Sequence, residues 1–299
     1  MTAPAPLRPG AALAEPVGLA FEKPAFAQRL LRRPATRIAL AWLLLVLLLA
    51  LAAPLVAGYD PLSGGDNALQ PPLTPGHWLG TDDLGRDIWA RVVFGTRVSL
   101  AVGIISAFFA VLIGVVVGAI AGYFGGWADT VLMRVAEFFQ TLPRFVVALI
   151  VIALYGASLA KMILVIALLS WPQLARVVRA TVATLRQSQF VDAARVAGMG
   201  HGAIILREIL PNVAAPIIVL GSLDIAGAIL IEASLSFFGL GEPNLVSWGG
   251  MLNDAQQYLR SAWWMSAFAG LAIALTVWAF NLLGDALNDA LNPRTGANP

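Results

Sequence analysis

The stretch VDAARVAG at residues 191–198 is a polar island between two long apolar segments, and it runs on to the sequence LPN at residues 210–212. Ser188 can cap a helix here, and the charge of Asp192 in its first turn complements the positive helix N-terminus. A helix-period pattern places small and apolar residues on one face, namely Phe190, Ala194 and Ala197. With Ala193 also small, the helix is slim enough to enter a groove on another protein.

The remainder of the island is expected to turn the chain back toward the next apolar segment. Glycines at positions 198, 200 and 202 can end the helix and permit a sharp reversal. A second short helix is expected at about residues 203–210. Pro211 suits the first turn of the helix that follows, because its φ is already fixed near the helical value.

The composition around this island is that of a polytopic membrane protein. Hydrophobic residues make up 59% of the 299 residues and charged residues only 12%, whereas soluble domains have about a quarter charged residues. At roughly 20 residues per helical span, there is room for six or seven spans. The absence of cysteine excludes disulfides, thiolate metal sites and a cysteine nucleophile.

The hydrophobicity pattern predicts an all-α membrane protein with six transmembrane helices. A cleaved signal peptide is the rival interpretation of the first apolar run, but that run lacks a clear cleavage site and is read as a retained span. The expected spans are residues 38–57, 98–122, a third that follows a short turn within 123–144, bends near Pro143 and continues to about 155, then 162–178 with a kink at Pro172, 213–238 and 263–283. Gly114 and Gly118 form a GxxxG pattern, which predicts close helix packing.

These spans divide the chain into a core and its flanking segments. We expect a tail at residues 1–36, a first transmembrane helix at 37–57, an outer loop at 58–97, a core at 98–285 that contains the loop 186–212, and a second tail at 286–299. Lysine and arginine cluster before the first span and around the loop 186–212. The positive-inside rule therefore places both termini and this loop in the cytoplasm.

Two carboxylates, Asp224 and Glu232, fall inside the fifth expected span. Eight residues separate them, which is about 12 Å along a helix axis and about 80° around it. Intramembrane carboxylates are candidates for function by default, so both are candidates for a translocation path. The alternative is a carboxylate hydrogen-bonded at the subunit interface, or, for Glu232, one near the outer boundary.

No catalytic site is expected in this chain. Serine, histidine and aspartate are present, but neither a nucleophile elbow nor a paired catalytic spacing is visible. The two histidines, His77 and His201, lie too far apart in sequence to suggest a metal site. No GxxxxGK[ST] loop for nucleotide phosphates is present either.

The island resembles the EAA loop of ABC-importer permeases, through the Asp-Ala-Ala run at residues 192–194, Gly198 and the Leu-Pro pair at residues 210–211. Asp192 replaces the usual Glu, and Glu208 stands where an Ile is common. Three further blocks are similar to the C-type subunit of the dipeptide, oligopeptide and nickel permeases, at residues 77–87, 122–129 and 232–241.

The resemblance implies a type I ABC-importer permease in the bacterial inner membrane. It implies a second permease subunit, two ATP-binding cassette subunits that bind ATP and Mg²⁺, and a periplasmic or lipid-anchored solute-binding protein, with membrane lipid but no nucleic acid as a further partner. The residues that the resemblance assigns to ATPase coupling are Asp192, Ala193, Ala194, Gly198, Leu210 and Pro211.

The segment at residues 77–87 has two open interpretations. It can be an outer surface that touches the binding protein or the partner permease, or a turn-rich loop whose charges pair locally. The contact candidates are His77, Thr81, Asp82, Arg86 and Asp87.

The expected substrate is a dipeptide or oligopeptide. A nickel or other small-solute importer is one alternative, and an ion-coupled secondary transporter that uses Asp224 and Glu232 is another.

Overall fold

A computed structural model describes residues 26, 30, 31 and 33–291, and within them the chain is helical without a regular strand. The expected N-terminal tail lies mostly outside these residues, as do the last eight residues. The helices are α2 (Pro34–Val56), α3 (Ile88–Phe124), α4 (Gly126–Thr141), α5 (Arg144–Tyr155), α6 (Leu159–Leu185), α7 (Gln189–Val196), α8 (His201–Ala203), η1 (Ile204–Ile209), α9 (Leu210–Leu235), η2 (Ser236–Leu240), α10 (Trp248–Ala255), η3 (Gln256–Tyr258) and α11 (Trp263–Leu291).

The described residues contain five helices long and apolar enough to cross a membrane, or six when the bent pair α4 and α5 counts as one span. These two helices meet at an angle of 80°. Pro143 is the N-cap residue of α5, and a proline cannot continue the preceding helix. The predicted bend near Pro143 is confirmed, and six spans agree with the expectation once the pair is counted together.

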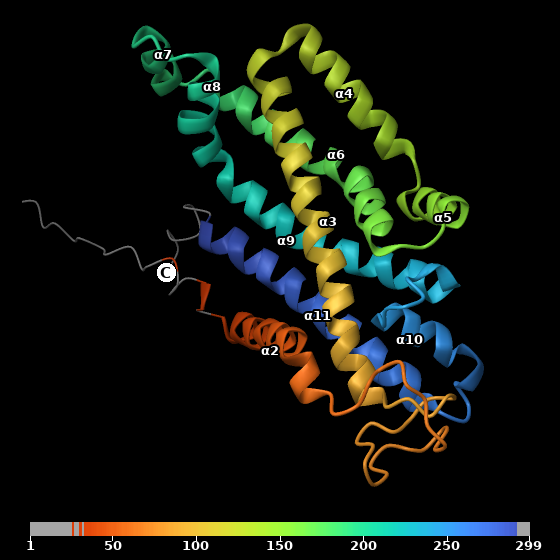
Figure 1. Cartoon of the computed structure of the whole chain (residues 1–299). Coiled ribbons are helices and arrows are strands. Elements are labelled where there is room, and N and C mark those ends of the chain that lie inside the picture. The colour runs from red at the N-terminus through yellow and green to blue at the C-terminus, as the bar shows by residue number, and fades with distance from the viewer. Residues whose placement is uncertain (1–25, 27–29, 32, 292–299) are drawn as a thin grey trace, which may run out of the picture.

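Helix α3 crosses the whole molecule and packs along α6 (Figure 1). A Cβ added at Gly118 or Gly122 would lie 2.5 Å from a carbonyl oxygen of α6, so only glycine permits this approach. Gly114 belongs to the same stripe and faces Leu174. The close packing predicted from the GxxxG pattern is therefore confirmed, and α6 is the partner helix.

Helix α2 lies beside α11, so both ends of the described chain come together (Figure 1). The indole of Trp42 donates a hydrogen bond to Thr276, at 3.1 Å. Arg33 and Asp289 form an ion pair at 2.9 Å. The two chain ends therefore lie at the same end of the bundle, as an even number of spans requires.

Three boundaries differ from the sequence-based expectation. Helix α3 begins at Ile88, ten residues before the predicted span, because the Asp87 carboxylate caps it by accepting a hydrogen bond from Ala90 N at 2.8 Å. Helix α11 continues to Leu291, into the expected C-terminal tail. Helix α6 extends from Leu159 to Leu185 and continues through Pro172, so it is longer at both ends than the predicted span 162–178.

Candidate functional site

The inner loop, which we define as residues 186–212, stands out from the end of the bundle where α3 and α6 meet (Figure 1). Helix α7 has one inward and one outward face. Val191 and Ala194 are buried and join an apolar cluster with Ile204 and Val213. The outward face is exposed and consists of Asp192, Ala193, Val196, Ala197 and Gly198.

Ala194 does not lie on the exposed side of α7. The sequence pattern places Phe190, Ala194 and Ala197 on one helical face, but Ala194 is 8% exposed and packs inside this chain, whereas Phe190 and Ala197 are exposed. Val196 is 90% exposed, and apolar side chains in such positions often mark contact sites when they are grouped. The sequence pattern did not single out Val196 because a lone valine on a polar helix carries no distinct signal.

Ser188 is the N-cap residue of α7, as predicted, but its side chain does not make the cap hydrogen bond. Its hydroxyl donates to the carbonyl of Leu185, at the end of α6, and makes no cap hydrogen bond to α7. The backbone carbonyl of Ser188 instead accepts from Val191 N, at 3.0 Å. A serine hydroxyl can bond to a nearby backbone carbonyl instead of capping a helix. Here it bonds to a carbonyl in the last turn of α6.

Gly198 ends α7 in a Schellman motif. Its φ is +79°, which a residue with a Cβ adopts only at a cost. Met199 N donates to Ala194 O at 3.1 Å and Gly198 N donates to Arg195 O at 3.0 Å, which satisfies two free carbonyls at the helix end. The prediction that this glycine ends the helix is confirmed.

A contact between distant residues holds the loop against α3. The hydroxyl of Tyr123, at the end of α3, and Nδ1 of His201 lie 2.9 Å apart. Arg195 pairs with Asp192 at 2.8 Å, and its guanidinium lies 6.0 Å from the ring centroid of Tyr123. Sequence reasoning missed this contact, because Tyr123 and His201 are 78 residues apart.

The second half of the inner loop is a π-helical turn at Ile204–Ile209 rather than a regular helix, and it leads directly into α9. Leu210 and Pro211 begin α9, as expected. The Asn212 side chain donates to the carbonyl of Glu208 at 2.7 Å. The carboxylate of Glu208 makes no hydrogen bond or ion pair with a described residue, and nothing in the structure explains the choice of glutamate there.

The outer segment at residues 77–87 is held by buried charges. Asp82 is 0% exposed and accepts from Arg86 at 2.6 Å and from Arg91. Asp254, near the end of α10, accepts from the same two arginines, at 3.1 and 2.7 Å. The sequence gives no signal for this pairing, since Asp254 is 163 residues from Arg91.

The remaining contact candidates of this segment also have partners within the chain. Thr81 is 0% exposed, and its hydroxyl donates to the carbonyl of Asn67. His77 Nδ1 lies 2.9 Å from Asp87, which is 3% exposed. The structure therefore favours local pairing over direct contact with a partner for Thr81, Asp82 and Asp87.

The two carboxylates of α9 lie in different surroundings. Glu232 is 1% exposed and accepts hydrogen bonds from Ser236 at 2.8 Å and Ser99 at 3.1 Å. Glu232 thus joins α9 to α3 within one chain, rather than joining two subunits as the alternative expects. Asp224 is only half-buried and makes no hydrogen bond to a described residue.

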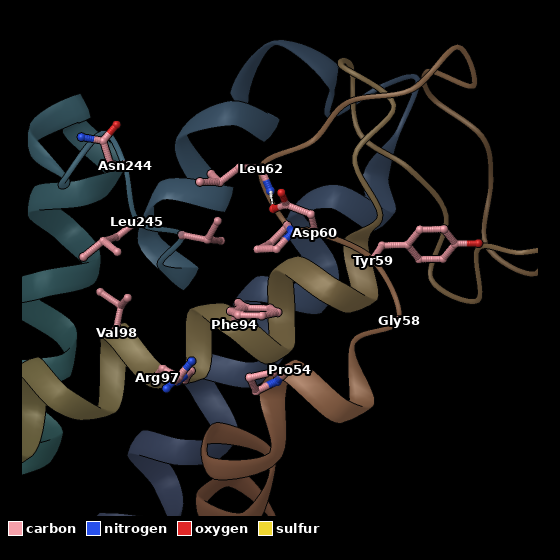
Figure 2. Close-up of a pocket in the computed structure, with 12 residues that line it drawn as sticks. Pro54, Gly58, Tyr59, Asp60, Leu62, Phe94, Arg97, Val98, Asn244 and Leu245 are labelled. Carbon is pink, nitrogen blue, oxygen red and sulfur yellow. Dashed lines mark hydrogen bonds between the residues drawn. The ribbon is translucent and has the colours of Figure 1, made fainter.

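A cavity of about 610 Å³ lies between the loop after α2, the first turns of α3 and the segment before α10 (Figure 2). Phe94 and Arg97 of α3 and Leu245 line it. Asp60 also lines the cavity, and hydrogen bonds from the Leu62 N–H and then the Ser63 hydroxyl hold the pKa of the Asp60 carboxyl below its usual value. Sequence reasoning did not predict this cavity.

Comparison with known proteins gives two family matches. Residues 114–297 match the family described as binding-protein-dependent transport system inner membrane component. Residues 25–72 match the N-terminal transmembrane domain of oligopeptide transport permease C.

Among individual relatives, the glutathione transport system permease protein GsiD of Pectobacterium atrosepticum is 40% identical over 271 residues, which cover 90% of each chain. The dipeptide transport system permease protein DppC of Alkalihalophilus pseudofirmus is 40% identical over 250 residues, covering 83% of this chain and 82% of the relative. GsiD of Escherichia coli O157:H7 is 40% identical over 272 residues, covering 90% and 89%.

Proposed function

The chain belongs to the family of binding-protein-dependent transport system inner membrane components, and we propose that it is one permease subunit of an ATP-driven importer of dipeptides or oligopeptides. The relatives named above are described as permeases of glutathione and dipeptide transport systems, and these descriptions support a peptide substrate. The chain provides half of the translocation path. A second permease subunit provides the other half.

The observation that carries the coupling role is the outward face of α7. It projects from the bundle and exposes Val196 together with Ala193 and Ala197, so a small apolar ridge is free to enter a cleft. Asp192 is 62% exposed beside it. We propose that this ridge docks on an ATP-binding cassette subunit, while Ala194 and Gly198 maintain the shape of the helix.

The inner loop is built to move as one piece with the spans. Its inward face packs into the cluster that contains Leu174 and Val178 of α6, and Tyr123 ties it to α3. Its other end, at Leu210 and Pro211, is the first turn of α9. A displacement of the docked helix is therefore passed to three spans, and ATP and the loaded binding protein favour different openings by binding the two states with different affinity.

The remaining assignments follow from this proposal. The inner loop and both chain ends lie in the cytoplasm, in a multi-pass protein of the bacterial inner membrane. The partner ATPases bind ATP and Mg²⁺, and this chain supplies no nucleotide site and no catalytic residue. On the outer side, we expect a solute-binding protein to contact the exposed Trp78 and Leu84 rather than the buried Asp82 and Asp87.

The experiment that tests this function is peptide uptake by the assembled transporter in membrane vesicles. We expect the chain to co-purify with an ATPase, and uptake to stop when ATP hydrolysis is blocked while the proton gradient persists. Uptake that follows the gradient instead would support the secondary-transporter alternative. Uptake of nickel but no peptide would support the small-solute alternative.

A further inference from the structure

The cavity between α2, α3 and the segment before α10 is lined by two opposite charges that do not pair with each other. Arg97 of α3 and Asp60 of the loop after α2 are its charged lining residues. No ion pair within 4.0 Å joins them, and Arg97 has no hydrogen bond or ion pair with any residue that the structure describes. Figure 2 shows Phe94 between them in the view. The space of about 610 Å³ is typical of sites for small molecules, so one ligand can reach both charges.

Asp60 is fixed in place but can still accept another donor. Its two oxygens accept from the Leu62 N–H at 3.0 Å and from the Ser63 hydroxyl at 2.8 Å. These hydrogen bonds hold the pKa of the Asp60 carboxyl below its usual value, so the group is charged at neutral pH. A carboxylate has about four acceptor positions. The remaining ones are available to an ammonium group.

The cavity lies at the level where two membrane-spanning segments end. Its lining residue Pro54 is close to the end of α2 at Val56, and Arg97 directly precedes the apolar segment 98–122 of α3. The indole of Trp89 donates to the carbonyl of Val56 at 3.1 Å, which ties the end of α2 to the first turn of α3. Tryptophan and arginine at the ends of spans are typical of the lipid headgroup region. The cavity therefore lies at headgroup depth.

An apolar face of α3 continues from Arg97 toward the middle of the membrane. Ile104 and Phe108 follow on the same face, about two and three helical turns after Arg97, and they are 42% and 61% exposed. Positions 97 and 108 are about 16 Å apart along the helix axis, and one leaflet contributes about 15 Å of hydrocarbon. An acyl chain whose headgroup lies beside Arg97 would contact apolar side chains along its length.

We propose that this cavity binds a phospholipid that carries a primary ammonium, of the phosphatidylethanolamine class. The phosphate binds the guanidinium of Arg97, and the ammonium donates to the carboxylate of Asp60. One acyl chain lies along Ile104 and Phe108. The lipid belongs to the leaflet on the side of the outer loop and joins this loop to α3. This inference goes beyond the proposed function and does not depend on which solute is transported.

The two charges together select the headgroup. The planar fork of Arg97 matches two phosphate oxygens. A primary ammonium has donors for Asp60, whereas the quaternary ammonium of phosphatidylcholine has none and phosphatidylglycerol has no positive charge. Because Arg97 and Asp60 are both exposed, each attraction is modest. We therefore expect reversible binding with a several-fold preference among headgroups.

The test is photolabelling of the complete transporter in nanodiscs by phosphatidylethanolamine with a diazirine on one acyl chain. Mass spectrometry of the digested protein locates the label. We expect label on α3 near Ile104 and Phe108, and about tenfold less of it in Arg97→Gln. Arg260→Gln is the matched control, because Arg260 is exposed and does not line the cavity; its labelling is expected to equal that of the wild type.

Asp60→Asn tests the preference for the ammonium. Phosphatidylglycerol and phosphatidylcholine with the same diazirine are expected to label α3 several-fold less than phosphatidylethanolamine in the wild type. In Asp60→Asn this preference over phosphatidylglycerol is expected to disappear, whereas Asp66→Asn, in the same loop but outside the cavity lining, retains it. Equal labelling of the wild type by all three lipids, or an unchanged preference in Asp60→Asn, would overturn the proposal.

Two other occupants give different results. Absence of label near Ile104 in the assembled wild-type transporter would mean that the second permease subunit covers this face. Glycerophosphoethanolamine, the headgroup without acyl chains, is expected to compete poorly; competition equal to that of the unlabelled lipid would mean a site for a soluble phosphate compound. Either result would overturn the lipid assignment.

A charge-preserving variant keeps the test decisive if Arg97→Gln does not assemble. Arg97→Lys retains a cation for the phosphate and is expected to keep most of the label. Loss of label from α3 in assembled Arg97→Lys, at a level equal to background, would contradict a phosphate contact at this position.

Discussion

The outer loop at residues 58–87 and the inner loop at residues 186–212 both carry charged motifs, but they use charge in opposite ways. In the outer loop, the motif aspartate Asp82 is 0% exposed and shares two arginines with Asp254. In the inner loop, the motif aspartate Asp192 is 62% exposed and pairs with Arg195, one turn away. The buried charge pairs of the outer loop hold its irregular backbone in place, whereas the helix of the inner loop exposes its aspartate on the protein surface.

The difference teaches that a sequence motif does not show which of its residues touch a partner. A buried, fully paired charge specifies the local fold, because removing one partner leaves the other uncompensated. An exposed pair contributes little to stability and is available for binding. Substitutions that separate folding from coupling are therefore the way to test the contrast.

The largest effect is expected for Asp82→Asn. It leaves Arg86 and Arg91 without their shared buried carboxylate, which costs about 3–5 kcal/mol in comparable cases. Thermal unfolding of the purified protein in detergent measures this loss. Asp192→Asn is the matched control and is expected to leave the unfolding midpoint unchanged; equal midpoints for both variants would remove the contrast between the loops.

The next effect sharpens the assignment of the two faces of α7. Ala194→Trp forces a large ring into the cluster around Val191 and Val213, and overpacking of this kind costs about 1–3 kcal/mol. Ala193→Trp, on the outward face, is expected to leave thermal stability unchanged. If Ala193→Trp were the more destabilising of the two, the faces would be assigned wrongly.

A smaller effect is expected for Gly198→Ala. A Cβ there meets no atom within 4 Å, so the only cost is the left-handed backbone at φ +79°, about 1 kcal/mol. Hydrogen exchange at the end of α7 is expected to accelerate, with exchange in α3 unaffected. Gly200→Ala serves as the control, because Gly200 has a negative φ and also has open space around it.

The smallest effect concerns Asp60 in the outer loop. Hydrogen bonds from the Leu62 N–H and the Ser63 hydroxyl lower the pKa of this carboxyl below its usual value. The stabilisation is therefore present above the unperturbed pKa and is lost as the pH falls through the lowered pKa. Titration of Asp60 by NMR is expected to show a lower pKa than in Ser63→Ala, and identical values would contradict this arrangement.

Much of the fold was predictable from local patterns. The glycine stripe of α3 predicted close packing, Pro143 predicted the bend, and Gly198 predicted the end of α7; in each case the residue acts through its own backbone or its absent side chain. The hydrogen bond from the Ser188 hydroxyl to Leu185, in place of a cap, and the inward position of Ala194 were not predictable in this way. Both depend on which neighbouring element competes for the side chain.

The pairs that sequence reasoning missed are long-range. The contacts of Asp254 with Arg91 and of Tyr123 with His201 join residues that come together only when the helices pack. Neither residue of such a pair has a local signal for its partner. Glu208 is the position for which neither the sequence nor the structure supplies a reason.

The most direct test of the central claim is the binding of the partner ATPase to a Val196→Asp variant. Val196 is 90% exposed on the outward face of α7, so a charge there leaves the fold intact but opposes insertion of the apolar ridge into a cleft. We expect normal membrane insertion and thermal stability, with at least tenfold weaker co-purification of the ATPase and a matching loss of uptake. Undiminished ATPase binding and uptake in this variant would contradict the docking role of the inner loop.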